Sequence, residues 1–251
     1  MASSEPGWQK LLSQAFPVLI SGTLYRLVES QEQVATSALV DDLDEQAILE
    51  QLLEATKPRL RPGTEHLHYL LAAPFRYPPL PWGSRFGRSF EPSLLYGALT
   101  ERTCLAESAF YRLVFWSGMQ TPPASGRLQT QHTLFSANYY SHQSVRLQGP
   151  IFEAGLDQLC HPAQYQQPQM LGSQMRSQGV EAFEYPSARC PEHGLNVALF
   201  EPRALTSRAP ESQSAWIGDT QADYVAFSSG KTLHKFASEL FKIDGQLPYP
   251  A

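Results

Sequence analysis

Three polar side chains of this 251-residue chain have the types and the order needed to act together on one charged ligand: Arg85, Tyr96 and Glu107. They follow one another at equal intervals of eleven residues (96 − 85 and 107 − 96). An arginine presents a planar fork of donors to a phosphate or carboxylate, a tyrosine ring can stack on a flat ligand, and a carboxylate can stabilise a developing positive charge. Each residue alone also has an ordinary explanation, as a surface arginine, a packed tyrosine or a solvent-facing glutamate, so the information lies in their order.

The elements expected around these residues are a loop, a strand and a helix. GSRFG at Gly83–Gly87 predicts a loop whose backbone can approach a ligand closely, because glycine has no Cβ atom. SLLYGAL at Ser93–Leu99 predicts a short buried strand that contains the tyrosine. Thr100 or Thr103 can cap a helix that carries the glutamate and that Gly118 ends.

Further along the chain, a serine in a Tyr-Pro-Ser-Ala-Arg context is followed by an asparagine and an apolar strand. The matching segments are GSRF at 83–86, LYGA at 95–98, LAE at 105–107, YPSAR at 185–189 and NVALFEP at 196–202, and we expect a first strand at 24–27 (LYRL). This set of motifs resembles the RES family, bacterial proteins named after an arginine, a glutamate and a serine. The family pattern is a Gly-x-Arg-aromatic loop, a strand with Leu/Val-Tyr-x-Ala, a helix with Leu-Ala-x-Glu or a close variant, and a downstream serine that follows proline.

The resemblance implies an α+β domain similar in fold to the ADP-ribosyltransferases, with a split sheet and surrounding helices. It also implies an enzyme that consumes NAD as its substrate, needs no prosthetic group and acts as the toxin of a toxin–antitoxin pair. Such an enzyme would break the nicotinamide–ribose bond and pass the ADP-ribose to inorganic phosphate or water, as an NAD phosphorylase or glycohydrolase does. The expected partner is an Xre-type antitoxin that blocks the NAD cleft, and we expect the protein to be a homodimer.

The same resemblance implies a role for each site residue. Cleavage of the nicotinamide–ribose bond builds oxocarbenium-like charge on the ribose, as in glycoside hydrolysis, and Glu107 would stabilise that charge. Tyr96 would stack on the nicotinamide and Arg85 would bind the pyrophosphate, which completes the predicted catalytic set. Ser187 would add a contact to a phosphate or to the ribose. The remaining predicted contacts with NAD are Gly83, Phe86 and Arg26.

The arginine loop departs from the family pattern. Phe86 stands where the family commonly has tryptophan, and Gly87 stands where it has asparagine. This departure leaves the ligand contacts of the loop open. Two alternatives also stay open beside NAD cleavage. The chain could be a protein ADP-ribosyltransferase, or it could be a module of the same fold that binds a nucleotide or a protein partner without turnover, including a subunit that has lost activity.

Composition argues against several other classes of protein. Only 17% of the residues are charged and the net charge is −5. This composition argues against a nucleic-acid-binding protein, because such proteins neutralise phosphates with basic side chains. The chain has no run of eighteen apolar residues, so we expect no transmembrane helix. The N-terminal MASSEPGWQK does not resemble a signal peptide, and we therefore expect a cytoplasmic protein.

The cysteines and histidines do not form a convincing metal site. Cys160 and His161 are adjacent, and Cys190 and His193 lie close together further on. Structural zinc sites usually show two spaced pairs of ligands, and an adjacent Cys-His pair is awkward for one metal. We predict no metal site, and the odd number of cysteines argues against a disulfide scaffold.

The remaining pattern predicts one α+β domain over residues 1–251, because strands and helices alternate irregularly and neither GxGxxG nor GxxxxGK[ST] occurs. Core motifs are expected at about 20–28 and 68–205. The clearest helix is at 44–56, in an N-terminal extension, and its stripe of Ile48, Leu49, Leu52 and Leu53 is expected to pack in the core rather than against a partner. Further expectations are a strand at 68–76, a surface excursion at 158–170, a helix at 171–178, and a C-terminal strand and helix at 222–228 and 232–241.

Overall fold

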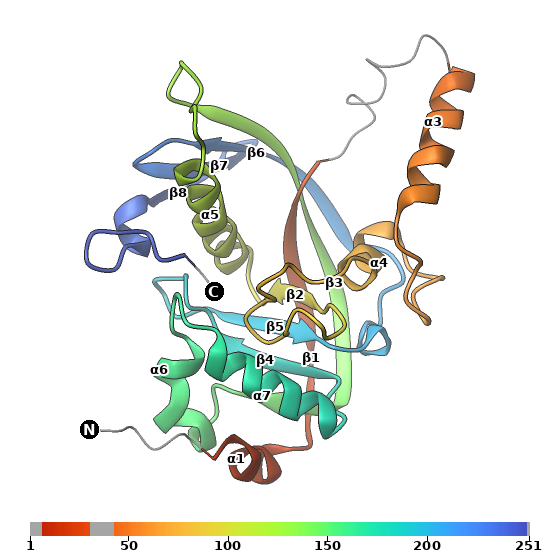
Figure 1. The fold of residues 1–251 in the computed structure, drawn as a ribbon, viewed down its shortest axis with the longest axis vertical. Helices are drawn as coiled ribbons and strands as arrows, with labels where there is room; N and C mark the ends of the chain where they lie inside the picture. The colour runs from red at the N-terminus through yellow and green to blue at the C-terminus, as the bar shows by residue number, and fades with distance from the viewer. Residues whose placement is uncertain (1–6, 31–42, 250–251) are drawn as a thin grey trace.

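A computed structural model of the chain describes residues 7–30 and 43–249, and its described strands form one eight-stranded sheet in the order β1-β2-β5-β4-β3-β6-β7-β8 (Figure 1). Helices pack on this mixed sheet, so the predicted α+β class is confirmed. The strands are β1 Val18–Glu29, β2 Leu95–Ala98, β3 Leu128–Arg146, β4 Ala182–Pro186, β5 Leu195–Leu199, β6 Ser212–Thr220, β7 Tyr224–Ser229 and β8 Thr232–Ala237. The helices are α1 Trp8–Ala15, α3 Leu43–Thr56, α4 Tyr69–Arg76, α5 Glu101–Ser117, α6 Leu156–Leu159 and α7 Gln166–Ser177, with 3-10 helices at η1 Pro150–Gly155, η2 Pro202–Ala204 and η3 Ser238–Phe241.

The long strand β3 connects the two parts of the sheet. One of its edges pairs with β1, and the other pairs with β6 over its first half and, in parallel, with β4 at its end. Strand β1 also meets β2, where Tyr25 lies opposite Ala98. The strands β1, β2, β5, β4 and β3 therefore close a circuit of pairings, in which β5 lies between β2 and β4.

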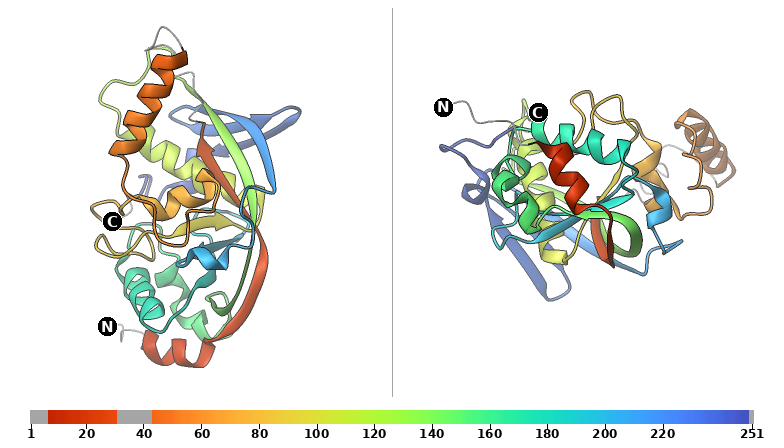
Figure 2. Two further views of the ribbon diagram at one scale, coloured as in Figure 1. Left: turned by 90° about the vertical axis from the view of Figure 1, so that its right-hand side faces the viewer. Right: turned by 90° about the horizontal axis from the view of Figure 1, so that it is seen from below.

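Three clusters of buried side chains hold the helices to the sheet. Helices α1 and α7 pack with β4 and β5 in the first cluster, and α4 packs with β1, β3 and β5 in the second. Helix α5 packs against β6, β7 and β8 in the third. Figure 2 shows α1 and α7 gathered at the end of the molecule opposite the β6–β8 hairpins. Burial of apolar surface of this kind is the main stabilising term in folding.

Helix α5 forms largely as predicted. It begins after Thr100, whose hydroxyl oxygen accepts a hydrogen bond from the backbone N–H of Thr103 at 3.2 Å. It ends at Ser117 before Gly118. Its buried residues, which include Leu105 and Phe110, face the third cluster. The helix therefore has a fixed rotation about its axis, and that rotation decides where its glutamate points.

The segment predicted as a strand at 68–76 is a helix, so that prediction was wrong. His68 caps α4, because its ring Nδ1 accepts a hydrogen bond from the backbone N–H of Leu70 at 3.3 Å. Leu71 and Phe75 are four residues apart and both are buried, which is the spacing of one helix face. A continuous apolar run does not distinguish a buried strand from a short buried helix.

Two further segments differ from expectation. Residues 232–241 form strand β8 followed by the 3-10 helix η3 rather than one helix, because β8 pairs with β7 along its length. The segment 158–170 is not a surface excursion, since Leu159 and Tyr165 are buried and α7 already begins at Gln166. Strand β6, which the sequence analysis did not predict, supplies the pairing between β3 and β7.

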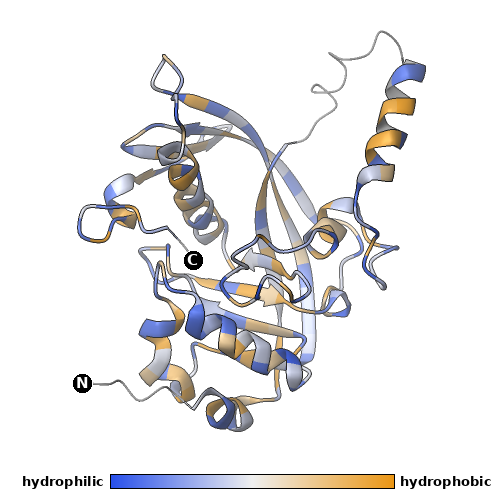
Figure 3. Cartoon of the chain, in the orientation of Figure 1, coloured by the Kyte–Doolittle hydropathy of each residue, from blue (hydrophilic) through white to orange (hydrophobic). Residues whose placement is uncertain are grey.

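Helix α3 forms where it was predicted, but its apolar stripe does not pack in the core. Ile48, Leu52 and Leu53 are exposed, and the helix stands away from the sheet (Figures 1 and 2). Figure 3 shows hydrophobic residues along this projecting helix. Its C-terminal end is tied to α4 by an ion pair between Glu54 and Arg76 at 2.7 Å. Across the described residues, no helix is long and apolar enough to cross a membrane.

A buried histidine makes the stability of this fold depend on pH. His132 on β3 is 5% exposed, and burial together with the nearby guanidinium of Arg112 lowers its pKa to about 4. The unfolded chain, with an ordinary histidine pKa near 6.5, binds a proton that the folded protein excludes as the pH falls from about 7 to 4. Stability is therefore lost over that interval.

We expect His132→Gln to reduce this loss. Between pH 7.5 and pH 5, the free energy of unfolding of the wild type should fall by roughly 1–2 kcal/mol more than that of the variant, measured by urea denaturation. The matched control is His142→Gln, which changes an exposed histidine and should keep the pH dependence of the wild type. An identical pH dependence in wild type and His132→Gln would contradict the argument.

Candidate functional site

Glu107 lies where α5 meets the ends of β4 and β5. Its Oε1 accepts two hydrogen bonds, from Ser187 Oγ at 2.6 Å and from Asn196 Nδ2 at 2.7 Å. The two donors come from parts of the chain 80 and 89 residues away. No other described group bonds the carboxylate, so Oε1 is fixed and Oε2 is left to face a ligand.

Ser187 directly follows β4, and its hydroxyl both donates and accepts hydrogen bonds. It donates to Glu107, while its oxygen accepts the backbone N–H groups of Arg189 at 3.1 Å and Cys190 at 2.9 Å. A hydroxyl has one proton and two acceptor positions, so these three bonds use its full capacity. The structure therefore gives Ser187 the task of orienting the carboxylate, and its direct contact with NAD stays a prediction.

Asn196 is a site residue to which the sequence analysis assigned no role. It lies on β5, opposite Tyr185 of β4 and Ala98 of β2, and is 2% exposed. Its Nδ2 donates to Glu107, but its Oδ1 is buried without a hydrogen-bond partner. A buried acceptor without a partner is costly. The signal in the sequence is a polar residue inside the apolar strand LNVAL.

The arginine loop is a tight turn with two different side chains at its tip. Ser84 and Gly87 face each other, with Ser84 N donating to Gly87 O at 2.7 Å, so Arg85 and Phe86 lie between them. The Phe86 ring is fully buried and packs edge-on against aromatic rings of β4. Gly83 has φ +78°, and a Cβ there would lie 2.4 Å from Gly87 O. Gly83 and the Phe86 ring thus build the loop, and their predicted contacts with NAD stay predictions.

The Arg85 side chain is anchored at one nitrogen. Its Nη1 donates to the carbonyls of Leu159 at 3.0 Å and His161 at 2.9 Å, and its guanidinium lies 4.6 Å from the ring centre of Tyr165. Burial lowers the pKa of Arg85, but Tyr165 and the carboxylate of Glu107 outweigh burial and raise it overall. Among the described residues Nε and Nη2 have no hydrogen bond, so one edge of the fork is available to an anion.

Tyr96 is held at its hydroxyl by the same loop. Its OH accepts the backbone N–H of Phe86 at 3.0 Å and shares a hydrogen bond with Ser84 Oγ at 3.0 Å. Burial raises the pKa of Tyr96 to about 12, so the phenol is neutral near pH 7. Proton abstraction is therefore not a role for Tyr96, and its predicted role of stacking depends on its ring.

Arg26 lies on β1 at a separate part of the site. Its Nη1 donates to the backbone carbonyl of Tyr96 at 2.7 Å, its Nε is buried without a partner, and burial lowers its pKa. It lines a cavity of about 960 Å³ together with Gly83, Ser84 and Tyr96. Residues of α3 and α4 also line this cavity, including Glu54, Tyr69 and Arg76, and so does Lys57, which follows α3.

The structure thus divides the predicted residues into two groups. The first group surrounds the carboxylate: Glu107 is bonded to Ser187 and acts electrostatically on Arg85. The second group lines the cavity and contains Arg26, and Tyr96 joins the two through its hydroxyl and its backbone carbonyl. Sequence reasoning also missed Tyr111 and Arg189, which feel the charge of the carboxylate, and Tyr165, which contacts Arg85 and Tyr111, because nothing in the spacing relates them to the site.

The cysteine and histidine pairs do not meet. Cys160 Sγ lies 3.6 Å from the carbonyl of Pro186, and Cys190 Sγ lies 3.2 Å from Glu192 Oε2. Within residues 7–30 and 43–249, no three His, Cys, Asp or Glu side chains are placed to hold a metal ion. All three cysteines are free thiols.

Comparison with known proteins adds two findings. A family model described as RES domain matches residues 58–220, which is more than half of the chain and includes every predicted site residue except Arg26. A chain in the crystal structure of the M. tuberculosis MbcT–MbcA toxin–antitoxin complex is similar in fold, with a TM-score of 0.50 and 11% sequence identity over 84% of this chain and 92% of that chain. At this identity the likeness concerns the fold alone. A search of curated protein sequences finds no match.

The bonds of Ser187 predict a large effect on stability. Ser187→Ala would leave the backbone N–H groups of Arg189 and Cys190 without their acceptor and Glu107 Oε1 without one of its two donors. The free energy of unfolding should therefore fall by about 1–3 kcal/mol in urea denaturation. The matched control is Ser177→Ala, because the Ser177 hydroxyl bonds only a carbonyl of its own helix at 2.8 Å. Equal losses in the two variants would show that the Ser187 hydroxyl does not hold the turn.

Proposed function

Because this chain belongs to the RES family, we propose that it is an enzyme that breaks the nicotinamide–ribose bond of NAD and transfers the ADP-ribose to inorganic phosphate or water. The observation that carries this proposal is the geometry of Glu107. One carboxylate oxygen is held by two donors, and the other is left for a ligand. A carboxylate that is already oriented stabilises positive charge without reorganising during the reaction.

The chemistry requires such a group. When the bond breaks, its electron pair leaves with the nicotinamide, whose ring nitrogen becomes neutral, and positive charge remains on the ribose. Glu107 Oε2 stabilises that charge. An oxygen of phosphate or water then bonds to the same ribose carbon, and an attacking water loses a proton to solvent. Phosphate is an anion that attacks without deprotonation, whereas water benefits from a general base, so we favour phosphate as the acceptor.

The other residues suit the two ends of the substrate. Arg85 offers the edge formed by Nε and Nη2 to a pyrophosphate, since Nη1 is already bonded to two carbonyls. Tyr96 and Arg26, which line the cavity, would contact the nicotinamide or the remaining ribose.

An enzyme that consumes NAD would harm the cell that makes it. We therefore propose that the protein is a toxin and that an antitoxin of the Xre type neutralises it by covering the NAD cleft. The support is that a structurally similar chain comes from a toxin–antitoxin complex. A homodimer and a cytoplasmic location remain part of the same proposal.

The proposal is tested by measuring nicotinamide release from NAD by the purified protein, with and without inorganic phosphate. Release that depends on phosphate supports a phosphorylase, and release without it supports a glycohydrolase. A gain in mass of the protein or of an added target would instead indicate protein ADP-ribosylation. Binding of NAD without release in either condition would support the non-catalytic module.

We expect Glu107→Gln to lower the rate of nicotinamide release at least about 100-fold while the affinity for NAD stays within about tenfold. Glutamine can still accept from Ser187 and Asn196, so the orientation is kept, but the charge that stabilises the transition state is lost. The rate comes from steady-state kinetics and the affinity from calorimetry. The control is Glu101→Gln in the exposed first turn of the same helix. An unchanged rate in Glu107→Gln would remove the electrostatic role.

We expect Arg85→Lys to weaken NAD binding by about 1–3 kcal/mol. Lysine carries the charge but cannot keep two carbonyl bonds and present a planar edge at the same time. Arg88→Lys is the control, because Arg88 is in the same loop and its guanidinium packs 5.9 Å from the Phe90 ring centre. The affinity for NAD is measured by calorimetry. Equal affinities of the wild type and Arg85→Lys would exclude Arg85 from the NAD site.

A further inference from the structure

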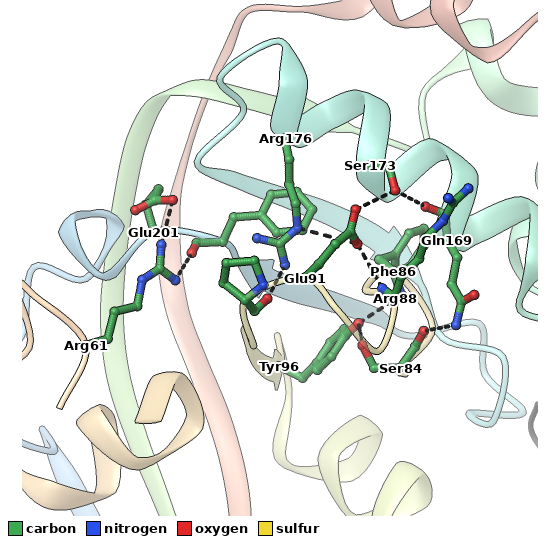
Figure 4. A network of polar contacts seen from close by, with 12 residues as sticks. Arg61, Ser84, Phe86, Arg88, Glu91, Tyr96, Gln169, Ser173, Arg176 and Glu201 are labelled. Atoms are coloured by element: carbon green, nitrogen blue, oxygen red, sulfur yellow. Dashed lines mark hydrogen bonds and ion pairs between the residues drawn. The ribbon is translucent and has the colours of Figure 1, made fainter. Parts of the chain in front are cut away.

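One face of helix α7 is built to receive the arginine loop, here defined as residues 82–91. Four residues of α7 at positions i, i+3, i+4 and i+7 lie on the same side of the helix. Each contacts the loop or the residue that follows it (Figure 4). These residues are Gln169, Gly172, Ser173 and Arg176.

Gln169 and Gly172 set how closely the loop and the helix approach. Gln169 Nε2 lies 3.1 Å from the carbonyl oxygens of both Trp82 and Ser84. A Cβ atom at Gly172 would lie 2.1 Å from the carbonyl oxygen of Phe86. That neighbour is backbone and cannot rotate away, so only glycine lets the helix pack this near to the loop.

Glu91 ties the far end of the loop to the same helix face. Its Oε1 accepts the hydroxyl of Ser173 at 2.5 Å, and its Oε2 accepts the backbone N–H of Arg88 at 2.8 Å. Arg176 Nε is 3.9 Å from Oε2, and Arg176 Nη2 donates to the carbonyl of Pro92 at 2.7 Å. The Glu91 side chain is 11% exposed, so these contacts are shielded from water and salt.

The contacts with α7 lie on both sides of Arg85, the residue that the proposed function assigns to the pyrophosphate. Arg85 lies between Ser84, whose carbonyl bonds Gln169, and Phe86, whose carbonyl touches Gly172. The segment 156–165 completes the support from the other side, because its carbonyls accept the Arg85 side chain. Backbone and side chain of the arginine are thus both held by residues 156–177.

We propose that helix α7 is the template that positions the arginine loop, with Gln169 and Glu91 as positioning residues for Arg85. This inference rests on the proposed function for the identity of the ligand that Arg85 receives, the pyrophosphate of NAD. It gives a purpose to Gln169: a side-chain amide that donates to two carbonyls can fix a loop that has no regular secondary structure of its own.

The test compares Glu91→Gln and Gln169→Ala with wild type. In both variants the backbone amides of Phe86 and Arg88 should exchange hydrogen at least about tenfold faster, because the loop opens locally while the sheet stays folded. KM for NAD should rise about fivefold or more, with kcat within about threefold, since a mobile arginine weakens binding more than chemistry. The control is Asp219→Asn on β6, which weakens another ion pair, with Arg127 at 2.9 Å, whose arginine side chain is half exposed.

The outcomes separate this inference from the proposed function. Unchanged exchange at residues 84–91 in both variants overturns the template. Faster exchange with unchanged KM also overturns it, because the loop would then not need to be held. If the wild type neither binds NAD nor releases nicotinamide, the proposed function fails, and exchange alone decides whether α7 holds the loop. Faster exchange in Asp219→Asn as well would show a general loss of stability and count against the template.

Discussion

The site depends on a single anchored oxygen. Glu107 Oε1 accepts from Ser187 and Asn196 at once, and these three residues come from α5, the turn after β4, and β5. A carboxylate that approached an apolar sheet without such donors would be expensive to bury. The two hydrogen bonds stabilise the charge and also choose which oxygen remains for a ligand. The predicted chemistry of Glu107 is therefore inseparable from how α5 docks on the sheet.

A second constraint is the turn that carries Arg85. Two adjacent residues at its tip have different surroundings: the Phe86 ring packs among the rings of β4, and the Arg85 guanidinium donates to the carbonyls of Leu159 and His161. The phenol of Tyr96 bonds the amide between them. The replacement of a tryptophan by Phe86, read from the sequence as a change in the ligand contacts of the loop, falls in the core in this structure, where it changes packing instead.

For the NAD substrate that we propose, the two groups of site residues offer two different surfaces. The carboxylate group and the cavity group are linked through Tyr96, which touches Arg26 by its carbonyl and the arginine loop by its hydroxyl. A dinucleotide has a cationic ring at one end and a pyrophosphate in the middle, and it needs both kinds of surface. Helices α3 and α4, which the family resemblance did not describe, also line the cavity.

The sequence by itself determined the local elements of the site and the kinds of chemistry present. The capped helix α5, strand β2, the glycine turn around Arg85 and the strands on both sides of Ser187 follow from propensity, capping and apolar periodicity, which act over a few residues. Only the tertiary structure decided that Asn196 meets Glu107, that Ser187 is used up in holding it, and that α7 supports the arginine loop. These contacts join residues about 80 to 90 positions apart, and strand register and helix rotation set them. The same reason explains why residues 68–76 form a helix and why the apolar stripe of α3 is exposed. An apolar pattern indicates that a surface is suited to burial. The packing of the whole chain decides whether that surface is buried and which residues cover it.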